Sequence, residues 1–455
     1  MSYTKLTTLA WIAASGLAAT TAQAAQLPAE EPAEGYLFRR ILGDATLDSY
    51  GIRAHGYMQL GLARNDNSSS AASAGGGSNF PVAPGDEGFK LEDLKLFIGK
   101  PIKTNILPHI TPLPGPTPTA SSFGFQAELM YGRSGQPGAM FGFDKDWGIN
   151  QPGASNPSLA AANRQNFLAV PQLYLLAYFP VWKGMALSVG RFGSGIGYEI
   201  PPQTRPTPNA FYSRSYAFVS QPSQVAGLLW SVNLARGASG LLAGEIGVVN
   251  GWQNWQDNNR SKSVLGALRW RSEDMRDALN YAFITGNEQN DPGTTVQAPV
   301  SLIVSPRGQR RQHHTLSVSR DFANGWSAAA EIVYGRQAGD GQADTVSIVT
   351  GPNFGGASYN GKNGILSYRA SPSMRYSARL EHFSARGGFG LFPLTAVRSN
   401  FNAVTLGFQY DLNKFVAFRP EIRYDWQSRH NAVLAFGRGT ASDQTTVSAD
   451  MVIRF

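Results

Sequence analysis

Strict alternation of apolar and charged residues is the feature that most constrains how this chain can fold. In Phe415–Trp426, every second residue is apolar or aromatic, and most of the residues between them are charged. Side chains of a β-strand alternate between its two faces, so the ionic face here carries Arg419, Glu421, Arg423 and Asp425. A soluble core would have to provide a partner for each buried charge. The pattern favours a strand with lipid on one side and a water-filled interior on the other.

This pattern repeats in about sixteen segments, each close to the length that a tilted membrane strand needs. In Met374–Phe383, for example, Arg375, Arg379 and Glu381 lie opposite apolar residues. The other predicted strands are Arg53–Ala63, Phe89–Ile98, Ser122–Arg133, Phe167–Phe179, Met185–Phe192, Val225–Leu234, Gly240–Asn250, Lys262–Arg271, Asp277–Gly286, His313–Phe322, Gly325–Gly335, Tyr359–Arg369, Phe401–Leu412 and Thr445–Phe455.

The links between the predicted strands alternate between long and short, as in barrels with short periplasmic turns and long outer loops. The short links are Pro180–Gly184, Arg236–Ser239, Ser272–Arg276, Ala323–Asn324, Ala370–Ser373 and Asn413–Lys414. One link breaks the rule: the proline-rich Lys100–Ser121 is long where a short turn is expected. It is either a periplasmic insertion in polyproline conformation or a sign that the strand count slips there. The expected fold is an all-β, transmembrane, antiparallel up-and-down β-barrel of about 16 strands over residues 51–455.

Composition excludes several other classes of protein. Outside the N-terminus there is no apolar run of membrane-helix length, and the mean hydropathy is −0.22, so helical membrane spans are not expected. The chain has no cysteine, which excludes disulfides, thiol nucleophiles and cysteine–zinc sites. Its net charge of +8 comes from scattered arginines rather than basic runs, so nucleic acid is not an expected partner.

The N-terminus has the pattern of a secretory signal. Lys5 precedes the apolar stretch Leu9–Ala19, and Ala22-Gln23-Ala24 fits a cleavage site. Residues 1–24 are therefore expected to be a signal peptide. Residues 25–50 are acidic and then amphipathic, and they predict a short helix or an extended arm on the periplasmic side. Whether this arm enters the lumen stays open.

Motifs for catalysis or metal binding are weak. Gly193–Gly197 is rich in glycine, but no helical pattern follows it, so turn glycines are expected rather than a nucleotide loop. His313 and His314 are adjacent, so in a strand they would point to opposite faces and make a poor chelating pair. HExxH and GxSxG motifs are absent. We expect no enzyme, metal or cofactor, although a Ser–His pair assembled from loops stays an alternative.

The interior charges are the remaining candidate site. A barrel of about sixteen strands is wide enough for an aqueous channel, and mixed charges along a lumen orient polar solutes and bias ion selectivity. For each residue the alternative is a salt bridge that only stiffens the wall. The predicted pore-lining residues are Arg53, Lys95, Glu128, Glu245, Arg269, Arg271, Glu331, Arg375, Arg379, Glu381, Arg419, Glu421 and Arg423, with Asp93 and Asp425 on the same face.

Several motifs resemble the OmpL-like putative beta-barrel porin family. They include Gly190-Arg-Phe192, Gly197-Tyr-Glu199, Asn209–Ser213, Val249–Trp252 and Tyr50–Tyr57. The resemblance implies an outer-membrane channel for passive diffusion of small hydrophilic solutes, with no catalytic residue to transfer. Anion-selective or substrate-selective transport, and a non-conducting structural or adhesive surface barrel, stay as alternatives. General porins are often trimers, so a homo-oligomer is a further expectation.

The same resemblance assigns roles to a loop and to the last strand. In general porins the third outer loop folds into the lumen, and here that loop is Gly193–Gln224, with prolines to fix its path. Bacterial outer-membrane barrels also end on a strand with a terminal aromatic residue, which the barrel-assembly machinery recognises, and Phe455 fits that position. The predicted constriction residues are Tyr198, Glu199, Arg205, Tyr212, Arg214 and Tyr216.

Overall fold

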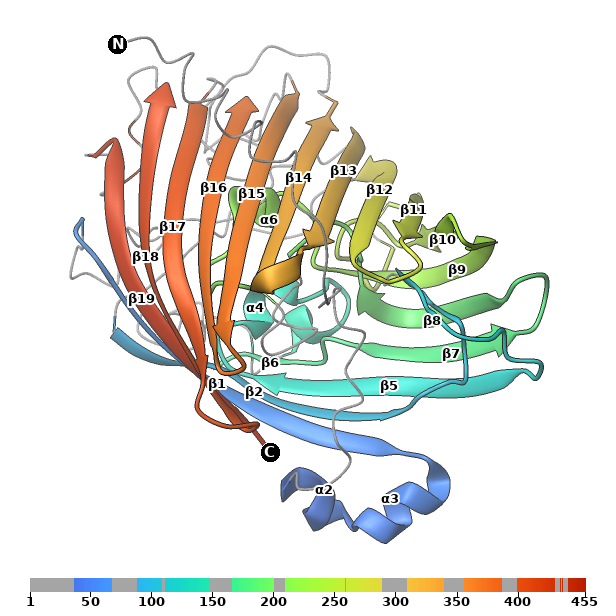
Figure 1. The fold of residues 1–455 in the computed structure, drawn as a ribbon. Coiled ribbons are helices and arrows are strands. Elements are labelled where there is room, and N and C mark those ends of the chain that lie inside the picture. The colour runs from blue at the N-terminus through green and yellow to red at the C-terminus, as the bar shows by residue number, and fades with distance from the viewer. Residues whose placement is uncertain are drawn as a thin grey trace.

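The computed structural model describes residues 37–67, 88–108, 111–147, 150, 166–199, 209–257, 259–288, 309–338, 356–386, 399–429, 434, 436 and 441–455. The predicted signal peptide and Arg205 lie outside these residues. Most of the described residues belong to one antiparallel sheet that curves and closes on itself (Figure 1).

Each strand pairs with its neighbours in the sequence, and the last strand pairs with the first. The sheet contains 17 segments, but β6 and β7 both pair with β5 and form one interrupted strand, so the barrel has sixteen (17 − 1). The strands are β1 (Arg53–Asn65), β2 (Gly88–Lys100), β5 (Ser122–Tyr131), β6 (Leu168–Ala169), β7 (Leu173–Phe179), β8 (Met185–Gly193), β9 (Gln224–Gly237), β10 (Gly240–Val249), β11 (Ser263–Arg271), β12 (Asp277–Glu288), β13 (Gln309–Asp321), β14 (Trp326–Gln337), β15 (Ala357–Ser371), β16 (Met374–Arg386), β17 (Ser399–Asp411), β18 (Val416–Arg429) and β19 (Asp443–Arg454).

The predicted fold class is confirmed. Each predicted strand overlaps one strand of the barrel, and most differences are one to three residues at the ends. Tight turns join the strands at one end, which we call the turn end, and the long links leave the other, which we call the loop end (Figure 1). The alternation of link lengths was therefore a correct guide to topology.

The two faces of the strands differ as the alternation predicts. On β18, Arg423 is completely buried inside the barrel, whereas its neighbour Ile422 points outward and is 48% exposed. Outward aromatic rings lie near both ends: those of Trp326 and Tyr368 are 4.8 Å apart toward the turn end, and those of Tyr424 and Trp426 are 5.5 Å apart toward the loop end. Such aromatic girdles are typical of barrels that cross a membrane.

The first and last strands close the barrel through their terminal residues. The amide of Gly56 donates to the carbonyl of Phe455 at 2.7 Å, and the amide of Phe455 donates back at 2.8 Å. A Cβ atom on Gly56 would come within 2.5 Å of the Phe455 ring. Glycine at position 56 therefore makes room for the ring that ends the chain.

The predicted N-terminal arm contains two short helices, α2 (Leu37–Leu42) and α3 (Asp44–Tyr50). They lie at the turn end beside the start of β1 (Figure 1). Arg39 joins them through an ion pair with Asp44 at 2.7 Å. The other short helices are α4 (Gly135–Gly138), η1 (Asp144–Asp146), α6 (Tyr216–Val219) and η3 (Ala323–Gly325). None of the helices in the described part of the chain is long and apolar enough to cross a membrane.

The proline-rich link is an insertion, and the strand count does not slip there. It contains a small hairpin of β3 (Ile106–Leu107) and β4 (Thr111–Pro112). Ile106 is fully buried against inward-facing side chains of β7, β8 and β10, including Tyr178. Arg236 donates to the carbonyl of Gly115 at 2.7 Å. The insertion therefore packs on the inner wall at the turn end, beneath one half of the lumen.

Candidate channel constriction

The link between β8 and β9, residues 194–223, folds into the barrel, and we call it L3. Its described parts are residues 194–199 and 209–223. Most of their polar partners are inward side chains of β14, β16 and β18, on the far side of the barrel from β8 and β9 (Figure 1). L3 therefore crosses the lumen instead of extending from the loop end.

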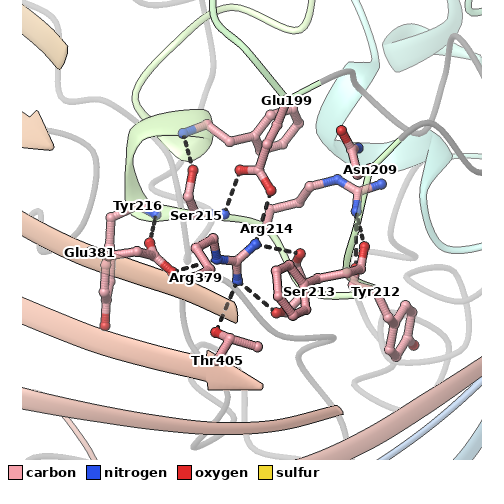
Figure 2. Close-up of polar contacts among 12 residues, drawn as sticks. Glu199, Asn209, Tyr212, Ser213, Arg214, Ser215, Tyr216, Arg379, Glu381 and Thr405 are labelled. Carbon is pink, nitrogen blue, oxygen red and sulfur yellow. Dashed lines mark hydrogen bonds and ion pairs between the residues drawn. The ribbon is translucent and has the colours of Figure 1, made fainter. Parts of the chain in front are cut away.

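Arg379 of β16 is the centre of this contact (Figure 2). Its side chain is fully buried and forms ion pairs with Glu199 of L3 at 2.9 Å and with Glu381 on its own strand at 2.8 Å. It also donates to the Ser213 hydroxyl at 2.9 Å and to Thr405 at 3.3 Å. One guanidinium thus links L3 to two neighbouring strands.

Carboxylates of the wall accept hydrogen bonds from the main chain of L3. The amide of Tyr198 donates to Glu331 at 2.7 Å, and the amide of Tyr216 donates to Glu381 at 2.7 Å. Glu421 accepts in the same way from the amides at positions 212 and 213, at 2.9 and 3.1 Å. Hydrogen bonds to an ionised acceptor are stronger than those between neutral groups. Three wall carboxylates thus fix the path of L3.

Arginines of β18 hold carbonyl groups of L3. Arg419 donates to the carbonyl of Asn209 at 2.9 Å and is itself held by Asp450 of β19 at 2.9 Å. Arg423 pairs with Glu381 and Asp425, both at 2.7 Å. Each guanidinium is compensated by a carboxylate, as a buried charge requires.

The helix α6 inside L3 packs on aromatic side chains of the wall. Ser215 caps its first turn by accepting from the amide of Phe218 at 3.1 Å. The Tyr216 ring lies 5.6 Å from that of Phe401, and its hydroxyl donates to Asp425 at 2.8 Å. This tyrosine therefore combines apolar packing with a charged partner.

Tyr212 connects L3 to the first two strands of the barrel, β1 and β2. Its hydroxyl donates to Glu92 of β2 at 2.5 Å. The hydroxyl also lies close to Gly61 of β1: a Cβ atom added to this glycine would be only 2.1 Å from it. Burial, and next the charge of Glu92, raise the pKa of Tyr212 well above its ordinary value. The hydroxyl therefore stays protonated and available as a donor.

The other half of the lumen contains an apolar cluster beside L3. Inward side chains of β9 to β12, including Leu229, Leu265 and Ile284, form a buried cluster with Phe192 and Ile196 where L3 begins. The link between β5 and β6 also reaches this region through its residue Asp144, which forms an ion pair at 2.5 Å with the fully buried Arg191 of β8. Arg191 in turn donates to Gln224 of β9 at 2.7 Å. Here L3 is held by this packing and by a hydrogen bond from Arg269 of β11 to the Gly195 carbonyl at 2.9 Å.

The predicted pore-lining residues lie in three settings. Arg379, Glu381, Arg419, Glu421, Arg423 and Glu331 are buried against L3, as described above. Lys95–Glu128 and Arg269–Glu245 are ion pairs within the wall, and Arg271 and Asp93 are also buried. Arg53 is exposed at the start of β1, and Arg375 is half-buried. Most of these charges therefore face partners inside the protein.

The predicted constriction residues in L3 also differ in their contacts. Glu199, Tyr212 and Tyr216 contact the wall. Arg214 is half-buried and donates to the Tyr212 carbonyl at 3.0 Å, while Tyr198 binds the wall through its amide.

The predicted pore-lining residues did not include Glu92, which contacts L3, or Asp450, which holds Arg419. Glu92 faces inward because the β1–β2 register shifts between Gln59 and Leu60, which turns Glu92 and Asp93 to the same side. No sequence signal marks that bulge. Asp450, by contrast, lies on the polar face of the last strand, and its alternation with apolar residues was a usable signal. Within the described residues, no group of three histidine, aspartate or glutamate side chains could hold a metal ion.

A closed antiparallel barrel with an apolar outer belt, an ionic interior and an infolded third loop defines the porin class of outer-membrane channels. The profile of the family Putative beta-barrel porin-2, OmpL-like, matches residues 51–455. The chain belongs to this family and is a channel protein of the bacterial outer membrane. No curated protein gives a significant match to the sequence.

Solved structures support the same fold at low sequence identity. OmpT of Vibrio cholerae, described in a trimer form, has a TM-score of 0.52 at 8% identity, over 89% of this chain and 99% of that chain. The outer-membrane channel DcaP of Acinetobacter baumannii has a TM-score of 0.52 at 10% identity, over 89% and 97%. An anion-selective porin from Comamonas acidovorans has a TM-score of 0.50 at 11% identity, over 89% and 99%. The similarity is to their fold.

Proposed function

We propose that the protein is a passive diffusion channel for small hydrophilic solutes and not an enzyme. The observation that carries this proposal is the position of L3, which is held across the lumen by Arg379, Glu421 and their neighbours. A loop fixed at both walls leaves a narrowed path of constant width. L3 then sets the size limit, together with the proline-rich insertion at the turn end.

Charge selectivity is expected to be weak, because the buried charges near L3 compensate each other. A second candidate is an anion-selective channel. It is favoured by inward charged side chains near the turn end that keep some exposure. They include Arg53, Arg369, Arg375 and Arg454 on the basic side, and Asp321 and Asp411 on the acidic side. This small excess of arginine would attract anions entering from that side.

Single-channel conductance in a planar bilayer under a KCl gradient tests both candidates. Discrete steps with a small reversal potential are expected for a general porin. A reversal potential strongly favouring anions would replace the first candidate by the second, and the Arg375→Gln variant should then reduce it. A folded barrel that gives no steps and does not make liposomes permeable to small sugars would contradict both, in favour of a non-conducting structural or adhesive barrel.

Three further expectations concern export and assembly, and they belong to this proposal. Residues 1–24 act as a secretory signal, and residues 25–50 form a periplasmic arm beside β1. The last strand, with Phe455, is recognised by the barrel-assembly machinery. The trimer form described for OmpT supports a homo-oligomer, with a trimer as the expected state.

A further inference from the structure

Polar side chains interrupt the apolar outer belt of the barrel on β15 to β17. On β16, the outward face is apolar or aromatic from Tyr376 to Leu380 and becomes polar at His382. On β14, it stays apolar from Trp326 to Tyr334. The apolar belt, measured from Tyr376 on β16 and from Trp326 on β14, is therefore shorter on β16 than on β14.

The interruption extends across neighbouring strands. Register places Lys362 of β15 and Asn402 of β17 on either side of His382, and the His382 Nδ1 and Asn402 Oδ1 atoms are 2.8 Å apart. His382 lies roughly 15 Å above Tyr376 along the barrel axis, within a belt about 25 Å tall. Lys362 is exposed there and makes no hydrogen bond or ion pair with any described residue. A cation at this depth needs a partner of opposite charge, and none of the described residues supplies one.

Two arginines lie closer to the loop end on the adjacent strands. Arg336 of β14 and Arg386 of β16 are both register partners of Ser358, so their strands are roughly 10 Å apart. Both side chains are exposed and point outward, as Lys362 does. None of the outward strand side chains described on β13 to β17 is acidic. Arg336, Lys362, His382, Arg386 and Asn402 form what we call the basic outer patch.

We propose that the basic outer patch binds the phosphate-bearing headgroup of a lipid in the outer leaflet. Short turns face the periplasm, so the loop end, where the patch lies, is at the outer leaflet. Arginine and lysine are the side chains that best hold phosphate oxygens, and basic clusters at a membrane surface recognise anionic headgroups. The long side chain of Lys362 can lie along the apolar wall and place its ammonium at headgroup level.

A lipid fits this surface better than a second copy of the chain. A copy would have to present carboxylates to three cations. In the strands that the structure describes, outward carboxylates occur only at strand ends, as with Asp277 and Asp443. An isologous contact would also bring the cations of two patches together. Phosphate supplies the missing negative charge directly.

The test compares binding of diphosphorylated lipid A, of the same lipid without its phosphates, and of inorganic phosphate. The full mature protein is purified in an uncharged detergent, and affinity is measured by microscale thermophoresis. The variant is Lys362→Ala/Arg386→Ala, and the matched control is Arg320→Ala/Lys414→Ala, which removes two cations at the turn end. Circular dichroism and light scattering report folding and oligomeric mass for each protein.

The native protein is expected to bind the phosphorylated lipid well above the other two probes. Binding should weaken roughly fivefold for each cation removed, hence about 25-fold in the Lys362→Ala/Arg386→Ala variant, and should stay unchanged in the control. Equal binding of the dephosphorylated lipid, equally tight binding of inorganic phosphate, or unchanged binding by the variant would overturn the proposal. A folded variant that loses oligomeric mass while keeping lipid affinity would instead assign the patch to an interface between copies. Channel conductance is not expected to change, so this test is independent of the proposed function.

Discussion

The two halves of the lumen hold the same loop by largely different contacts. On β14, β16 and β18, buried arginines and carboxylates such as Arg379 and Glu421 bind L3 through hydrogen bonds and ion pairs. On β9 to β12, apolar side chains such as Leu265 and Ile284 pack against the start of L3, and Arg269 adds a single hydrogen bond to the Gly195 carbonyl. Charged hydrogen bonds are directional, whereas apolar packing is not. The ionic half therefore fixes where L3 lies, and the apolar half provides burial without a fixed position.

The largest effect should come from Arg379→Ala. This change leaves Glu199 and Glu381 buried with one partner fewer, at a cost of about 3–5 kcal/mol in the stability of the L3 contact. Released from the wall, L3 should admit larger sugars in liposome-swelling assays and become sensitive to protease. Arg375→Ala is the control, since Arg375 lies on the same strand but makes no hydrogen bond or ion pair with the described residues of L3. An unchanged size limit in Arg379→Ala would contradict the central role of the ionic half.

Leu265→Ala tests the apolar half. The cavity should lower the free energy of unfolding by about 2–5 kcal/mol, measured by urea denaturation. The size limit for sugars should change little, because the wall contacts of L3 remain. Leu268→Ala on the same strand points outward and should have a smaller effect. If Leu265→Ala widened the channel as much as Arg379→Ala, the division of roles between the two halves would fail.

Gly61→Leu tests the space that the wall leaves for L3. The new side chain would occupy the position of the Tyr212 hydroxyl and of Glu92, which costs about 1–3 kcal/mol and displaces the loop. Conductance should become noisier and protease cleavage of L3 faster. Gly364→Leu on β15 is the control, since no atom lies within 4 Å of its Cβ position. Equal behaviour of the two variants would show that L3 does not depend on this contact.

The smallest effect should come from Tyr212→Phe, which removes one hydrogen bond to Glu92 and keeps the ring. A loss of about 1 kcal/mol in stability is expected, with a slight increase in conductance. Tyr131→Phe removes an exposed hydroxyl contact to Asn166 and should change neither. A large effect of Tyr212→Phe would mean that Glu92 is more important for L3 than Arg379 and its partners.

Much of the architecture was predictable because it follows from local pattern. The alternation in segments such as Phe415–Trp426 determines which side chains face inward, and link lengths determine which end carries the loops. The partners of the inward charges were not predictable, since Glu199 and Arg379 are brought together only by closure of the barrel. The same holds for Glu92, whose direction depends on a bulge, and for the proline-rich link, whose path depends on space between β7 and β10.

The wall holds L3 largely by its main chain. The amides of Tyr198, Ser213 and Tyr216 and the carbonyl of Asn209 would be present whatever side chains stood there. The position of the loop therefore depends little on which side chains it carries. Residues of L3 that point into the passage are free to change, through evolution or by design, while the loop stays in place. Such a scaffold can acquire new solute preferences by substitution in one segment, without rebuilding the barrel that carries it.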